Sequence, residues 1–163
     1  MTWLISDANI IIDMEVGELL DKMFRLPQQF AVPDILYAEE LETHHPHLPG
    51  LGLQVLAVND SFILETYRLM EVYRRPGFND LLALSLAKQE QCPLLTGDEQ
   101  LRLAAEQEDV TVRGTLWVIQ QLLLANIINA DDARKAYERM KKDGRRLPWQ
   151  LVEKQLNDMN STG

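Results

Sequence analysis

The strongest constraint on the fold is the alternation of short apolar runs with segments of helical periodicity. Apolar runs of strand length occur at residues 3–6, 30–32, 53–58, 93–96 and 110–113, and a helix-like segment follows each of them. Strands that alternate with helices form mainly parallel sheets. We therefore expect an α/β fold, in which a central parallel sheet of four or five strands is flanked by helices.

Capping residues, prolines and apolar periodicity predict where the helices lie. We expect them from about Asn9, at 18–25, from Pro33 to about Thr43, and at 60–73, 80–91 and 99–107. Three further helices are expected after residue 115, at 116–127, from 131 to Asp143-Gly144, and from about 149. The prolines and the glycine of residues 44–50 predict a loop.

Carboxylates follow the predicted strands where open α/β sheets bind ligands. Asp7 ends the first strand and Asp98 follows the fourth, so both face the same crevice. Glu39 and Glu40 lie one turn into the helix after the second strand, and Asp80 opens the helix before the fourth. Converging carboxylates need a cation, and oxygen-only sites favour Mg²⁺ or Mn²⁺. Helix capping explains each acid taken singly, so the interpretation rests on the set.

Four segments, in matching order and spacing, resemble the motifs of PIN domains. Residues 5–13 (ISDANIIID) place an Asp after an apolar strand, and residues 38–41 (AEEL) place a Glu on a helix. Residues 79–87 (NDLLALSLA) place an Asp before an alanine-rich helix, and residues 94–98 (LLTGD) end a strand with Thr-x-Asp. The resemblance covers roughly residues 3–115.

The resemblance implies a PIN fold and a Mg²⁺- or Mn²⁺-dependent endoribonuclease, which in bacteria is often a VapC-like toxin paired with an antitoxin. Its metal-binding and catalytic residues would be Asp7, Glu40, Asp80 and Asp98. Glu40 is preferred to Glu39 because an aliphatic residue, Leu41, follows it. Asn9 and Thr96 would support the site through hydrogen bonds, and Glu39 is a further supporting residue. The expected partners are an RNA substrate and an antitoxin protein.

The C-terminal third departs from the short toxins of this family. We predict a PIN-like nuclease domain over residues 1–115 and a helical extension over 116–163 that packs on the same domain. Residues 116–128 are more apolar than a lone surface helix, so they either complete the core or form a homodimer interface. Because PIN domains commonly pair, we expect a homodimer.

The formal net charge of −9 argues by itself against nucleic-acid binding. Its distribution is uneven, because residues 1–133 hold 8 basic and 21 acidic residues, whereas residues 134–163 hold 8 basic and 4 acidic ones. Candidate contacts to an RNA backbone are therefore Lys141, Lys142, Arg145 and Arg146. A solvated helix end explains these four residues equally well.

Other interpretations remain open. A metal-dependent phosphatase is the competing enzyme, although Asp7-Ala8-Asn9 lacks the second Asp of the D-x-D pattern. A PIN-like module that binds RNA or protein without cleavage is the competing binder. His44, His45 and His47 suit Zn²⁺, but their loop composition favours solvated side chains.

The single cysteine, Cys92, excludes an internal disulfide, and its place before a buried strand favours the core over a nucleophilic role. The apolar run before Asp7 is too short for a signal peptide, and no later run suits a membrane span. The expected location is therefore the cytoplasm.

Overall fold

The computed structural model describes residues 3–162, with side chains described as far as residue 159. Five strands form one sheet in the order β3-β2-β1-β4-β5, and every pairing is parallel. The strands are β1 (Trp3–Ser6), β2 (Gln29–Pro33), β3 (Gln54–Leu56), β4 (Leu94–Leu95) and β5 (Val112–Arg113). This arrangement confirms the predicted α/β class with a central parallel sheet.

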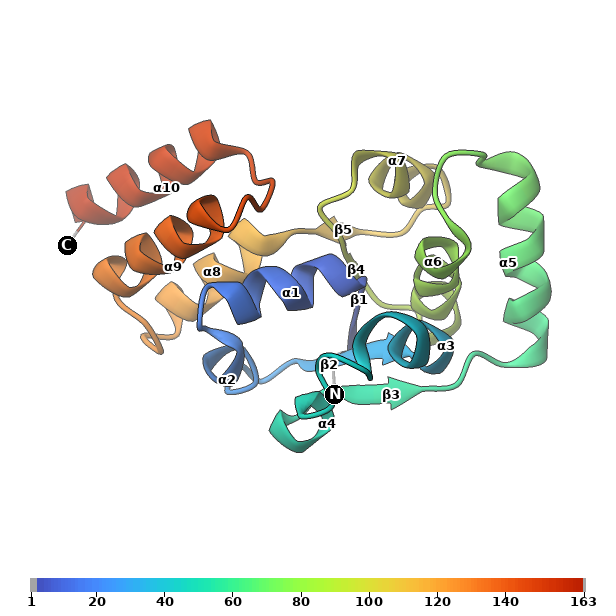
Figure 1. The fold of residues 1–163 in the computed structure, drawn as a ribbon. Helices are drawn as coiled ribbons and strands as arrows, with labels where there is room; N and C mark the ends of the chain where they lie inside the picture. The colour runs from blue at the N-terminus through green and yellow to red at the C-terminus, as the bar shows by residue number, and fades with distance from the viewer. Residues whose placement is uncertain (1–2, 163) are drawn as a thin grey trace.

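The helices flank this sheet and continue beyond it (Figure 1). Those before β4 are α1 (Ala8–Val16), α2 (Leu20–Met23), α3 (Asp34–Leu36), the π-helix η1 (Tyr37–Leu41), α4 (Leu48–Leu51), α5 (Asp60–Val72) and α6 (Phe78–Glu90). Those after β4 are α7 (Glu99–Gln107), α8 (Thr115–Leu124), α9 (Ala130–Lys142) and α10 (Trp149–Thr162).

Two local expectations are wrong. The single helix expected from Pro33 to Thr43 is instead α3 followed by η1, where the N–H of Glu42 donates to the carbonyl of Tyr37, five residues back. The loop expected over residues 44–50 contains the start of α4, whose Leu48 is fully buried. Its histidines are not all solvated either, because His45 and His47 contact Glu15.

The helix that carries Asp80 is the central support of the sheet. Residues 81–87 of α6 are all buried, and α6 packs against β1, β2 and β4. On its outer side, Thr66 of α5 donates a 2.6 Å hydrogen bond to Ser85. Lys88 bridges Glu65 and Glu108 at 2.6 and 2.8 Å, which links α5 and α6 to the end of α7. These contacts fix the position of α6, and with it Asp80, relative to the strands and to its neighbouring helices.

The helices after β5 gather at the side of the sheet away from α5 (Figure 1). One face of α8 is buried within the chain and includes Val118, Ile119, Leu122 and Leu123. Because α8 packs against α1, α2 and α9, this helix completes the core. At Gly17, a Cβ atom would lie 2.6 Å from the side chain of Met140, which shows how closely α9 meets the end of α1. No helix within residues 3–162 is both long and apolar enough to cross a membrane.

Candidate carboxylate site

The ends of β1 and β4 bring Asp7 and Thr96 together. These strands are parallel neighbours, so their carboxyl ends meet at one edge of the sheet. Thr96 Oγ1 donates a 2.6 Å hydrogen bond to Asp7 Oδ2, and Oδ1 accepts at 3.0 Å from the N–H of Ile10 in the first turn of α1. Asp7 is therefore both the cap of α1 and a carboxylate fixed at the edge of the sheet.

Asp7 is 1% exposed, and burial raises its pKa from 3.8 to about 7. The hydrogen bonds from Thr96 and Ile10 oppose this rise, whereas the charges of Asp80 and Asp13 add to it. Within residues 3–159, no Lys, Arg or His forms an ion pair with Asp7, Asp80 or Asp98. The protein thus supplies hydrogen bonds for these carboxylates but no cation.

Asp98 and Asp80 sit at two further helix starts. Asp98 caps α7, since its Oδ1 accepts a 2.8 Å hydrogen bond from the N–H of Leu101. Asp80 lies in the first turn of α6, and its Oδ2 accepts from the N–H of Gly77 at 3.3 Å. Burial raises the pKa of Asp80, and repulsion from Asp98 contributes to the rise. The positive ends of α1, α6 and α7 therefore all carry an acid of the predicted set.

The two glutamates lie on η1, and they differ in their contacts. Glu39 Oε2 accepts a 2.9 Å hydrogen bond from Asn79 Nδ2, next to Asp80. Glu40 reaches solvent, yet partial burial of its carboxylate raises its pKa. Asn79 opposes this rise through a hydrogen bond, whereas the charges of Asp80 and Glu39 add to it. Asn79 also keeps a buried Oδ1 without a hydrogen-bond partner. Both glutamates thus lie beside Asn79 and its neighbour Asp80.

The carboxylates share one electrostatic environment but do not crowd one point. Asp80 raises the pKa of both Asp7 and Glu40, and Asp98 raises that of Asp80. Among the described residues, however, no three of these acids bring carboxylate oxygens within 4.8 Å of one another. Like charges without a cation repel, which explains the open spacing. The oxygen-only donors, the buried uncompensated Asp7 and the orphaned Asn79 oxygen fit a hard divalent cation.

A second polar cluster, which the sequence did not reveal, adjoins the site. Asp13, on the same helix as Asp7, is buried and accepts from Thr115 Oγ1 at 2.8 Å and from Arg145 Nε at 2.6 Å. Arg145 also donates to Asn9 Oδ1 at 3.1 Å. Asn9, expected to support the carboxylates, thus binds a residue 136 positions away. The sequence does hold one sign that Asp13 is buried and paired, because it is the single charged residue in the apolar segment 10–14.

Arg145 owes its position to the turn that ends α9. Gly144 adopts a φ of +86°, and the N–H of Arg145 donates to the carbonyl of Met140 at 2.9 Å. This left-handed residue, which glycine tolerates best, directs the chain back toward α1. Arg145 and Arg146 line a small hollow together with Asn9, Asp13 and Asp98.

The four candidate RNA-binding residues are not equivalent. Lys141 Nζ lies 5.5 Å from the ring centre of Trp149, and Lys142 is exposed on α9. Arg145 is held by Asp13 and Asn9, so its charge is already paired. Arg146 is exposed. It lines the hollow beside Asp98 and also a larger cavity beside Thr96. Together they are a mixed group and not a uniform basic surface.

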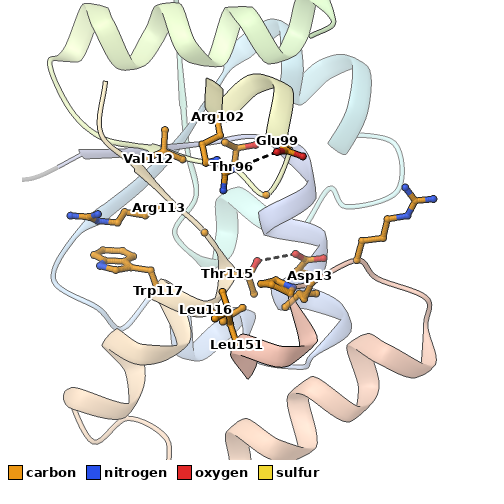
Figure 2. Close-up of a pocket in the computed structure, with 15 residues that line it drawn as sticks. Asp13, Thr96, Glu99, Arg102, Val112, Arg113, Thr115, Leu116, Trp117 and Leu151 are labelled. Atoms are coloured by element: carbon orange, nitrogen blue, oxygen red, sulfur yellow. Dashed lines mark hydrogen bonds and ion pairs between the residues drawn. The ribbon is translucent and has the colours of Figure 1, made fainter. Parts of the chain in front are cut away.

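A cavity of about 550 Å³ opens beside Thr96 and Gly97 (Figure 2). Figure 2 shows Trp117 and Arg113 on one side of it and Asp13 with Thr115 on another. The Arg113 guanidinium lies 5.9 Å from the centre of the Trp117 ring. The remaining lining mixes charged and apolar side chains, among them Arg146, Leu147, Leu151 and Arg102, whose guanidinium lies 3.7 Å from the carboxylate of Glu99.

Comparison with known proteins places this geometry in a family. A family model for the PIN domain matches residues 3–161. No curated protein matches the chain. Two solved structures are similar at 17% identity: VapBC2 from Rickettsia felis bound to a promoter DNA fragment, and VapBC-1 from nontypeable Haemophilus influenzae. The first match covers 69% of this chain and 98% of the other with a TM-score of 0.48, and the second covers 71% and 99% with 0.49.

Proposed function

Because this chain belongs to the PIN domain family, we propose that it is a metal-dependent endoribonuclease and the toxin of a toxin–antitoxin pair. The observation that carries the proposal is Asp7, a buried carboxylate held by Thr96 and Ile10 with no cationic side chain beside it. A fold that keeps such a group at the carboxyl end of its central strand bears a cost in stability. A metal-binding role for Asp7 explains why a carboxylate that lowers the stability of the fold is kept at this position.

Asp7, Glu40, Asp80 and Asp98 would hold Mg²⁺ or Mn²⁺. Such an ion, when bound between carboxylates, activates water and stabilises the leaving oxygen of a phosphodiester. The hydroxyl of Thr96 donates a hydrogen bond to Asp7 and accepts one, at 3.0 Å, from the backbone N–H of Asp98. One hydroxyl group therefore orients two acids of the set. Glu39 and Asn79 fix the relative positions of η1 and α6.

The helix ends contribute to binding a phosphate. Asp7 and Asp98 cap α1 and α7, and Asp80 lies in the first turn of α6. The partial positive charge of these three helix N-termini favours anions. These dipoles offset part of the repulsion among the carboxylates. They also offset part of the repulsion between an acidic chain and an RNA backbone, which the net charge of −9 would otherwise produce.

We place the single-stranded RNA in the cavity beside Thr96 and Gly97 (Figure 2). Trp117, backed by Arg113, offers a base a stacking surface, and stacking on aromatic rings is the usual way single strands are held. Arg146, at the end nearer Asp98, offers a cation to the backbone. Of the four basic residues considered for RNA binding, only Arg146 contacts the RNA in this proposed placement.

The proposal is tested by cleavage of a labelled RNA oligonucleotide. We expect cleavage that EDTA abolishes and that added Mn²⁺ restores, and we expect Asp98→Asn to lose it while retaining RNA binding. Cleavage that survives EDTA would contradict a metal-dependent site. RNA binding without cleavage at any Mn²⁺ concentration would favour the non-cleaving module, and hydrolysis of a phosphomonoester alone would favour the phosphatase.

The toxin role and the partners are parts of the same proposal. Expression of the wild-type chain should arrest growth, Asp98→Asn should not, and the product of a short upstream gene should relieve the arrest. Homodimerisation would use a surface other than the core face of α8, which holds the already buried Val118, Ile119, Leu122 and Leu123. The exposed Leu64, Tyr67 and Val72 of α5 are one group of apolar side chains that could serve as the interface, and light scattering checks the mass. We propose the cytoplasm as the location of the protein.

A further inference from the structure

Glu15, His45 and His47 form a cluster of metal-ligand type away from the carboxylate site. Glu15 lies near the end of α1, whereas the two histidines follow η1. Eight residues separate Asp7 from Glu15 along the helix, a rise of about 12 Å. One ligand atom from each of the three side chains lies within 4.8 Å of the others, and no other set of three does so among the described residues.

The contact between His45 and Glu15 is short without being a hydrogen bond. His45 Nδ1 and Glu15 Oε2 are 2.6 Å apart, and both atoms are buried, yet neither has a hydrogen-bond partner of acceptable geometry. A protonated imidazole that simply paired with the carboxylate would direct its N–H at the oxygen. The two buried atoms therefore leave each other unsatisfied, and a cation bound between them, with the atoms moved apart to about 3.4 Å, would satisfy both.

His47 completes the set from the solvent side. Its Nε2 lies 3.2 Å from Glu15 Oε1, and its side chain is 49% exposed, against 21% for His45 and 32% for Glu15. Ligands at about 2.1 Å from a tetrahedral ion are about 3.4 Å apart, so the pair from His47 already has this separation. The set leaves one side open to solvent, where water or another ligand completes the coordination.

We propose that Glu15, His45 and His47 form a second metal site, which takes a divalent transition metal of the Zn²⁺ type. Two imidazoles and one carboxylate are donors that suit Zn²⁺ and not Mg²⁺ or Ca²⁺, which require oxygen ligands. The donor chemistry therefore differs from that of the oxygen-only set around Asp7. Occupancy of one site by its own ion does not require occupancy of the other.

A metal bound here ties α1 to the segment that carries Glu39 and Glu40. The N–H of His45 donates a 2.7 Å hydrogen bond to the carbonyl of Leu41, the last residue of η1. Pinning His45 to Glu15 therefore pins the end of η1 to α1. Because a ligand that binds only the folded state stabilises it, Zn²⁺ should raise the melting temperature.

The test uses the full chain with Mg²⁺ in excess, so that oxygen-only sites are filled, and Zn²⁺ or Co²⁺ as the probe. The wild-type protein should bind one equivalent of Co²⁺ with the intense visible bands of tetrahedral coordination, and Zn²⁺ should displace it. His45→Ala and His47→Ala should each lose affinity by at least about 100-fold, the upper range for outer-shell partners alone. The matched control is His44→Ala, an exposed neighbour outside the cluster, which should bind like the wild type.

A second readout requires no variant to fold. The chain has three histidines, so imidazole NMR signals of the wild-type protein can be followed individually. Zn²⁺ should move the signals of His45 and His47 and leave those of His44 in place. Equal movement of all three signals, unchanged Co²⁺ binding in the His45→Ala/His47→Ala double variant, or no Co²⁺ bands in the wild type would each overturn the proposal.

Discussion

Arg145 Nε lies 2.6 Å from Asp13 Oδ1, joining the turn after α9 to the helix that starts at Asp7. Removing one partner of a buried pair leaves the other charge without compensation, at a cost of about 3–5 kcal/mol when both are fully buried. Arg145 is 22% exposed, so we expect Arg145→Ala to lower the free energy of unfolding by about 2 kcal/mol.

Urea unfolding of Arg145→Ala, Arg146→Ala and Asp13→Asn/Arg145→Ala checks this cost. The double variant should recover part of the lost free energy of unfolding, because the uncompensated charge of Asp13 is gone. Arg146→Ala, the control, should unfold like the wild type. In a separate RNA-binding measurement, Arg146→Ala should weaken binding and reduce the slope of log affinity against log salt by about 0.7, which corresponds to the loss of one phosphate contact. Equal stability of Arg145→Ala and the wild type would mean that the Asp13 contact contributes nothing.

The ionisation of Asp7 should make the metal-free protein less stable as the pH rises. Burial raises the pKa of Asp7 from 3.8 to about 7, so the folded protein retains a proton that the unfolded chain releases. Between about pH 4 and 7 the free energy of unfolding therefore falls as pH rises, by on the order of 4 kcal/mol, and it levels off above. Asp7→Asn removes this group from the titration.

Unfolding in EDTA at about pH 4.5, 6 and 8 gives the comparison. The free energy of unfolding of Asp7→Asn relative to that of the wild type should increase with each step in pH. At the highest pH, Mn²⁺ should reduce this difference in stability, because it binds and stabilises only the wild type. Parallel stability curves for the two proteins would show that Asp7 has no shifted pKa.

Asp98 has a capping role and a proposed metal role, and two substitutions separate them. Asn retains an oxygen that can accept from the N–H of Leu101, whereas Ala does not. Asp98→Asn should abolish cleavage with stability unchanged or raised in EDTA. Asp98→Ala should abolish cleavage and also lose about 1 kcal/mol of stability. Clear destabilisation of both variants in EDTA would point to a purely structural acid.

Trp117 should carry a measurable share of RNA affinity. Loss of one aromatic stacking partner costs about 1–3 kcal/mol per base, which corresponds to a fall in affinity of about 5- to 150-fold. Fluorescence anisotropy with a single-stranded RNA in EDTA should show this fall for Trp117→Ala and near wild-type binding for Trp117→Phe, which keeps a ring. Unchanged affinity of Trp117→Ala would place the RNA outside this cavity.

Much of the fold was predictable because its central strands β1, β2 and β4 are short buried runs bounded by helix and turn signals. The apolar runs at 3–6 and 30–32 match β1 and β2, and the segment 99–107 matches α7 residue for residue. Asp7 and Asp98 were recognisable since each lies between a strand of the parallel sheet and the helix that follows it. The division into residues 1–115 and 116–163 stays a prediction, although buried residues of both parts belong to one core cluster.

The rest depended on backbone detail and on contacts distant in sequence. The π-helical turn of η1 changes the helical register, so apolar periodicity could not decide between Glu39 and Glu40. The contact between Asp13 and Arg145 joins residues 132 positions apart, and no local pattern predicts such a pair. His45 and His47 looked solvated because their partner, Glu15, lies about thirty residues earlier in the chain, on α1.

The central claim is that Asp7, Asp80 and Asp98, with Glu40, bind a catalytic divalent cation. The most direct test is a crystal structure of the protein soaked in Mn²⁺, with the ion located by its anomalous scattering. The account predicts an anomalous peak between Asp7, Asp80 and Asp98, with carboxylate oxygens drawn in to about 2.2 Å. Full Mn²⁺ occupancy elsewhere, with these carboxylates still apart and no peak between them, would contradict it.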